Sequence, residues 1–223
     1  MFERFAIFYT PTGALADFGA AWLGWDSATG RAVPHPDTGL DVATITATPR
    51  KYGLHGTLKA PFRLSVESNP ANLQMAVADF AKRHAAVDIG HLQMAHHHGF
   101  IALRPASDPP ALHALARAVV TELDQHRAPL TDADIARRRK APLTARQDTQ
   151  MLDWGYPYIF DDFRFHLTLS GPLPDAQGAQ VVSTLQPMLA PVIATPWVID
   201  AVTLMGQDAD GMFHQIHRYA LTG

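Results

Sequence analysis

The chain has 223 residues, of which 47% are hydrophobic and 17% charged, the balance of a globular domain that buries a sizeable core. Its formal net charge of −3 gives no overall attraction to nucleic acid, and the lack of cysteine excludes disulfides, thiolate catalysis and cysteine-ligated metals. The N-terminal residues do not resemble a signal peptide, and no run approaches the roughly 18 apolar residues of a membrane span. We therefore expect a soluble, cytoplasmic protein.

The first quarter of the chain reads as a strand, a helix and a long connection. Aromatic and β-branched residues over Arg4–Thr10 predict an opening strand, and Ala14–Trp25 has a helical pattern. Glycine and proline punctuate Ser27–Pro49, and a connection of this length is more often functional than idle. It leads to the basic segment Arg50–Tyr52, which fits either an anionic substrate or a solvated strand edge.

The segment Leu54–Leu58 carries the first candidate chemistry. In a strand, His55 and Thr57 would point to the same face, because side chains alternate between faces. Lys59 would share that face and is the candidate cation for a substrate. Tyr52, just before the motif, is a candidate substrate contact.

A second His-x-Thr pattern occurs 111 residues later, in the segment Phe165–Leu169. His166 and Thr168 again share a strand face, and Ser170 takes the position that corresponds to Lys59. An aromatic turn leads into this segment, and its Tyr158 is a candidate for stacking on a base or sugar, although packing between lobes fits it equally.

Each motif is followed by the same order of predicted elements: a helical stretch, a strand, a turn and a second strand. Phe100 follows His55 by 45 residues, and Phe213 follows His166 by 47. Matching order and spacing predict a duplicated strand–helix–hairpin unit in an α+β protein. We expect an N-terminal lobe over residues 1–127, and a linker plus C-terminal lobe over 128–223, in one unit with a shared cleft. The predicted elements are Asn69–Ala86, Val87–Ala95 and Phe100–Arg104 in the first half, and Asp175–Leu189, Trp197–Met205 and Met212–Leu221 in the second.

Three further features have competing interpretations. The run Arg137–Lys140 is more typical of a solvated helix face than of a phosphate contact, since acids precede it. His96–His98 resembles a metal site, but consecutive strand residues alternate faces, so we predict a hairpin turn and no metal. His217, on the last predicted strand, is a candidate for supporting the substrate site. Pro109–Arg127 has the clearest helical periodicity and is predicted to pack on the core.

Two facing His-x-Thr pairs suit one kind of reaction centre. Histidine titrates near neutrality, so one imidazole can accept a proton while the other donates one. Threonine hydroxyls are weak nucleophiles but good donors to an oxyanion. A phosphodiester undergoing in-line displacement needs a base on one side, an acid opposite and donors to its non-bridging oxygens, without requiring a metal.

These residues resemble the two-histidine (2H) phosphoesterase superfamily, and the longer segment Lys51–Phe62 is most similar to a branch associated with bacterial phosphonate-utilisation operons. The resemblance implies a bilobal, pseudo-twofold α+β fold with antiparallel sheets lining a central cleft. It implies His55 and His166 as the catalytic acid–base pair, with Thr57 and Thr168 holding the phosphate. It further implies an enzyme that hydrolyses a cyclic phosphodiester, such as a phosphoribosyl cyclic phosphate. We also expect a monomer that uses neither a metal nor a cofactor.

Two other functions stay open on the sequence. The protein could be an RNA-end 2′,3′-cyclic phosphodiesterase or a 2′-5′ ligase-like enzyme, or a non-catalytic binder of phosphoesters. A small phosphorylated metabolite or nucleotide is favoured over RNA as the ligand, since the chain carries no net positive charge.

Overall fold

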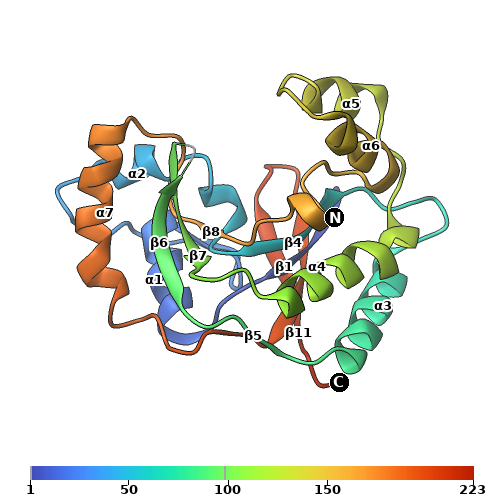
Figure 1. The fold of residues 1–223 in the computed structure, drawn as a ribbon, viewed down its shortest axis with the longest axis horizontal. Helices are drawn as coiled ribbons and strands as arrows, with labels where there is room; N and C mark the ends of the chain where they lie inside the picture. Colours follow the sequence, from blue (N-terminus) through green and yellow to red (C-terminus); the bar gives the residue numbers. More distant parts are fainter. Residues whose placement is uncertain (1, 98) are drawn as a thin grey trace.

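The computed structural model describes residues 2–97 and 99–223, with only the backbone considered at residue 97. The fold is mixed α+β with antiparallel pairing, as the sequence predicts (Figure 1). No helix among the described residues has both the length and the apolar character to cross a membrane.

A seven-stranded sheet organises the molecule, in the order β11-β10-β1-β4-β8-β7-β6. Neighbouring strands are antiparallel throughout. The predicted opening strand and both predicted hairpins are present. The strands are β1 (Arg4–Tyr9), β4 (Gly56–Phe62), β6 (Leu92–His97), β7 (Phe100–Pro105), β8 (Leu167–Thr168), β10 (Ala201–Gln207) and β11 (Phe213–Ala220).

Helices cover the sheet, and local signals fix their ends. The Asn69 side chain accepts from the backbone N–H of Asn72 at the start of α3, and Thr144 forms a capping box with Gln147 at the start of α6. Gly24 ends α1 in the left-handed region. The helices are α1 (Gly13–Leu23), α2 (Val42–Ile45), α3 (Pro70–Arg83), α4 (Pro110–Glu122), α5 (Asp132–Arg138), α6 (Ala145–Trp154) and α7 (Asp175–Leu189).

Short elements complete the chain. Among the described residues, three 3₁₀ turns and two small strand pairs lie in the connections. They are η1 (Arg50–Tyr52), η2 (Asp124–His126), η3 (Phe160–Asp162), the pair β2 (Trp25–Asp26) and β3 (Arg31–Ala32), and the pair β5 (Val87–Asp88) and β9 (Val198–Ile199). Strand β3 falls in the predicted loop-rich connection, and β5 and β9 fall at the start of predicted strands.

The two halves of the sequence are interleaved in the sheet, which corrects the simple division into lobes at residues 1–127 and 128–223. The hairpin β6–β7 of the first half pairs with β8, the motif strand of the second half. The hairpin β10–β11 of the second half pairs with β1, which lies beside β4, the first motif strand. Helix α3 packs on β10 and β11, and α7 packs on β6 and β7. Each half therefore gives its motif strand and helix to one lobe and its hairpin to the other.

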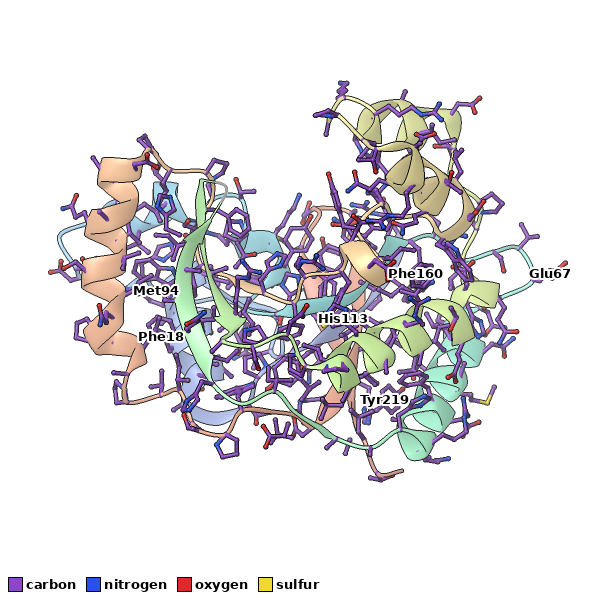
Figure 2. All side chains as sticks on the ribbon, in the orientation of Figure 1. Phe18, Glu67, Met94, His113, Phe160 and Tyr219 are labelled. Carbon is purple, nitrogen blue, oxygen red and sulfur yellow. The ribbon has the colours of Figure 1, made fainter. Side chains whose placement is uncertain are left out.

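Helices α5 and α6 stand apart from the sheet, as an arm at the upper right of Figure 1. We call residues 132–154 the helical arm. Figure 2 shows the Phe160 side chain between α4 and this arm. Its ring lies 4.4 Å from the Arg117 guanidinium and 5.5 Å from the Trp154 ring, which joins the arm to the body of the molecule.

The two motif strands meet at the centre of the sheet, where Gly56 on β4 is opposite Leu167 on β8. The Phe165 ring covers Gly56 so closely that a Cβ atom on residue 56 would lie 2.3 Å from Phe165 Cε2. Glycine at position 56 is therefore required for the junction between the two halves of the sheet.

Gly56→Ala is expected to lower the free energy of unfolding by about 1–3 kcal/mol, because the added methyl group overpacks the junction. Urea unfolding measures the effect. The double variant Gly56→Ala/Phe165→Leu makes room for the methyl group and should recover part of the loss. Equal stability of Gly56→Ala and wild type would contradict the close contact.

Candidate active site

The register at the junction places the four motif side chains at the corners of a quadrilateral. Because Gly56 is opposite Leu167 in an antiparallel pair, His55 is opposite Thr168, and Thr57 is opposite His166. All four belong to the face opposite that of Gly56 and Leu167. The two histidines occupy one diagonal and the two threonines the other, and diagonal neighbours in a sheet have Cβ atoms on the order of 7–8 Å apart.

The two imidazoles are oriented in the same way. Nδ1 of His55 lies 2.9 Å from the carbonyl oxygen of Gly53, and Nδ1 of His166 lies 2.8 Å from that of Arg164. Each histidine therefore donates Nδ1–H to the carbonyl two residues before it. The Nε2 atom is left as the proton acceptor of the neutral ring.

Both histidines lie just before their strands, since β4 begins at Gly56 and β8 at Leu167. His55 Nε2 is 3.2 Å from Thr57 Oγ1, so this threonine hydroxyl donates to the imidazole when no substrate is bound. The predicted sharing of a face by His55 and Thr57 is therefore seen in a direct contact.

The environment of the imidazoles favours their neutral form. Desolvation lowers the pKa of His55 to about 4, while its bond to Gly53 acts in the opposite direction and the neighbouring His166 adds to the decrease. The His55 ring stacks on Phe8 with 4.0 Å between centroids. Desolvation also lowers the pKa of His166, whose ring lies 5.6 Å from that of Phe100. Both groups can therefore accept protons at neutral pH.

The four motif residues open into a cavity of about 690 Å³, which we call the charged cavity. Tyr52, a predicted substrate contact, lies in its wall and stacks on Phe213 with 5.0 Å between ring centroids. The cavity extends to the helical arm, whose Arg137 and Arg138 also line it.

A second cavity of about 600 Å³, the aromatic cavity, adjoins the first and shares Thr57, His166 and Tyr156 with it. Tyr158, the other predicted aromatic contact, lines this cavity and is 41% exposed. The four motif residues therefore have a basic cavity on one side and an aromatic cavity on the other.

Lys59 does not point into the cleft, contrary to the prediction. Phe8 is opposite Thr57 and Ile7 is opposite Lys59, so Leu58 is an extra residue on β4 that breaks the alternation of faces. Lys59 is 3% exposed and donates to Asp124 Oδ1 at 2.7 Å and to the Val120 carbonyl at 3.0 Å. It holds α4 against the sheet and does not contact a substrate in the cleft.

Ser170 and His217 are also absent from the walls of the two cavities. Strand β8 ends at Thr168, and the buried Ser170 hydroxyl accepts from the Ile101 N–H at 2.9 Å and donates to the Gly171 carbonyl at 2.8 Å. His217 is exposed on the edge strand β11. Both predictions of substrate contact are therefore wrong.

The cations of the basic run at residues 137–140 point to different surroundings in the structure. Arg139 binds Asp148 on the surface, as expected for a solvated helix face, whereas Arg137 and Arg138 line the charged cavity. The position of Arg138 in the cavity wall could not be predicted from the sequence, because it depends on how the helical arm folds.

The histidine tract at residues 96–98 is only partly described. His96 lies on β6 with its ring packed near Gly178 of α7, and residue 98 is outside the described residues. The side chains of residues 97 and 98 are outside the described part of the chain; among those of residues 2–96 and 99–223, no group of three or more histidine or carboxylate side chains converges in a way that could hold a metal ion.

Comparison with known proteins gives a family match. The model of a family described as "Protein of unknown function (DUF1045)" matches residues 57–214. Two curated proteins named ribose 1,5-bisphosphate phosphokinase PhnN are similar. The one from Janthinobacterium sp. (strain Marseille) is 35% identical over 93% of this chain and 48% of that protein. The one from Laribacter hongkongensis (strain HLHK9) is 34% identical over 77% of this chain and 41% of that protein. The chain thus spans about half the length of these relatives.

Two solved structures match over the full chain. A crystal structure of a phosphoesterase is 17% identical with a TM-score of 0.44, and covers 100% of both chains. Escherichia coli LigT complexed with 3′-AMP is 13% identical with a TM-score of 0.47, again over 100% of both chains.

Lys59→Met is expected to lower the free energy of unfolding by about 1–3 kcal/mol, because Asp124 loses a hydrogen-bonded cation while Arg127 still binds it. The same variant should keep kcat/KM for a cyclic phosphate within about threefold of wild type. Urea unfolding and steady-state rates test the two expectations. A much larger loss of activity in the folded variant would place Lys59 in contact with substrate.

The His55 imidazole is expected to titrate with a midpoint near pH 4 in NMR spectra of the free protein. Since this pKa lies below the unfolded value of about 6.5, the neutral ring stabilises the fold above pH ~6.5. That contribution is lost as the pH falls through about 4. The urea-unfolded chain is the control, and a His55 midpoint near 6.5 in the folded protein would contradict the desolvated environment.

Proposed function

We propose that this chain, which belongs to the family described as "Protein of unknown function (DUF1045)", is a phosphoesterase that opens a cyclic phosphodiester by acid–base catalysis. The observation that carries the proposal is the diagonal placement of His55 and His166 across the β4–β8 pair, with Thr57 and Thr168 on the other diagonal. Two imidazoles on opposite sides of one cleft suit the entering and leaving oxygens of an in-line displacement.

The reaction consumes one water molecule. One neutral imidazole takes a proton from water at Nε2 while the water oxygen bonds to phosphorus. The bond from phosphorus to one ring oxygen breaks, and the other imidazole, protonated, gives its proton to that oxygen. The product is an open phosphate monoester with a free hydroxyl group.

The surroundings of the two rings suggest their roles. His55 stacks on Phe8 and has a strongly lowered pKa, so it is suited to be the base. His166 lies in both cavities and is suited to be the acid once an anionic substrate raises its pKa. Thr57 and Thr168 would donate to the non-bridging phosphate oxygens, and this set of groups is sufficient without a metal.

The names of the curated relatives guide the choice of substrate. A P-loop kinase requires glycine and lysine in the pattern G-x-x-x-x-G-K-[ST], and no lysine follows a glycine in this chain. We therefore assign the kinase activity named for the relatives to the part of them that this chain does not match. Opening a phosphoribosyl cyclic phosphate yields a ribose bisphosphate, which is the class of compound in the relatives' name. A phosphoribosyl cyclic phosphate is accordingly the proposed substrate.

A nucleotide substrate is the second candidate, favoured by the aromatic cavity. Phe100, Tyr156, Tyr158 and Phe163 line this chamber next to His166, and a base could stack there. An RNA-end 2′,3′-cyclic phosphodiesterase or a 2′-5′ ligase-like enzyme would use that chamber for the terminal nucleoside.

Replacing either histidine by alanine is expected to lower kcat by roughly 10²–10⁴-fold, because each removes a proton-transfer group. Activity of the wild type should persist in EDTA. Release of phosphate monoester from phosphoribosyl cyclic phosphate and from 2′,3′-cyclic AMP measures both the chemistry and the preference between the two candidates.

Thr144→Ala, which alters the exposed cap of α6, is the matched control and should leave kcat unchanged. Undiminished turnover in both His55→Ala and His166→Ala, or complete loss of activity in EDTA, would overturn the proposed mechanism.

A further inference from the structure

The charged cavity is more basic than the hydrolysis of one phosphodiester requires. Its walls carry five cationic and two acidic side chains, although the whole chain has a net charge of −3. Two of the cations come from the helical arm, which lies away from the motif strands. The cationic residues are Arg4, Lys51, Arg63, Arg137 and Arg138, and the acidic residues are Glu3 and Asp208.

Most of these cations already have a partner. Arg63 and Arg137 both bind the buried carboxylate of Asp134, at 2.8 and 2.7 Å. Arg4 donates Nε–H to the neutral amide of Gln207 at 2.5 Å. Arg138, by contrast, forms no ion pair or side-chain hydrogen bond with the side chains described at residues 2–96 and 99–223, and its buried Nε has no acceptor there.

The Arg138 guanidinium is nevertheless held in a defined place. It lies 5.1 Å from the centre of the Tyr156 ring, which belongs to the wall shared by the two cavities. Desolvation lowers the pKa of Arg138, the charges of Arg137 and Arg4 add to the decrease, and Tyr156 and the carboxylate of Asp134 act in the opposite direction. A desolvated cation with no directly bonded carboxylate is costly, and an anion in the cavity would reduce that cost.

We propose that Arg138, together with Arg4 and the Tyr156 ring, binds a phosphate monoester of the substrate, separate from the phosphorus that is attacked. The planar guanidinium presents paired donors that match a phosphate group. The preferred substrate is then a sugar that carries a cyclic phosphodiester and a second, terminal phosphate. This inference rests on the proposed function for the reacting end of the substrate, but the binding site can be tested without turnover.

The first experiment compares two substrates, ribose 1,2-cyclic phosphate with and without a 5-phosphate. Arg138→Met should lower kcat/KM for the 5-phosphorylated compound by roughly 10- to 100-fold, the value of a charged hydrogen-bonding contact. It should change kcat/KM for the other compound by less than about twofold. Arg139→Met is the matched control, since Arg139 is one position along and binds Asp148 outside the cavity.

Equal losses for both substrates, or the same loss in Arg139→Met, would overturn the proposal. Thermal unfolding checks that the variants are folded. If Arg138→Met does not fold, Arg138→Lys keeps the positive charge but lacks the planar guanidinium with its paired donors. This variant should weaken the preference for the 5-phosphate by roughly threefold or more.

The second experiment measures binding alone. Ribose 5-phosphate is titrated calorimetrically into His55→Ala, into His55→Ala/Arg138→Met and into His55→Ala/Arg139→Met. Loss of roughly 10- to 100-fold in affinity only in the Arg138 variant supports the site, even if no cyclic phosphate is turned over. Equal affinity in all three proteins would overturn it.

Discussion

The whole site depends on one short antiparallel contact, the pairing of Gly56 with Leu167. This contact joins the two parts of the sheet, and its register decides that a histidine of one strand is opposite a threonine of the other. A shift by one residue would turn the side chains of one strand to the opposite face and separate the imidazoles. Glycine at position 56 leaves room for the Phe165 ring, which lies directly over it.

Around that contact, the backbone rather than other side chains orients the two imidazoles. The carbonyl two residues before each histidine accepts the Nδ1 proton, so both rings present Nε2 to the cleft without a carboxylate behind them. A carboxylate partner would raise the imidazole pKa, whereas burial here lowers it. The arrangement keeps the free site uncharged at its centre and leaves the attraction of anions to the arginines of the cavity wall.

The sequence predicted the features that depend on local pattern. The doubled His-x-Thr motif, the order of elements and the antiparallel α+β class all follow from alternation and spacing, and all agree with the structure. The prediction for Lys59 failed at the bulge around Leu58, because an extra residue in one strand leaves no mark in an alternating pattern. Arg138 was assigned to a solvated face, since its exposure depends on how the helical arm folds over the cleft. The interleaving of the two halves depends on which strands pair in the folded sheet, and the equal spacing of elements along the sequence does not predict that pairing.

That interleaving has a consequence for how the fold could be assembled. Each half keeps its motif strand and helix on one side and sends its hairpin to the other, and the two crossing segments, β5 and β9, pair where they pass. A half-length polypeptide could complete this arrangement only with a second copy of itself. The present chain thus has the arrangement that a strand-exchanged homodimer of two half-length chains would have, with both subunits in one polypeptide. Because the two halves have different sequences, the two ends of the cleft are lined by different residues.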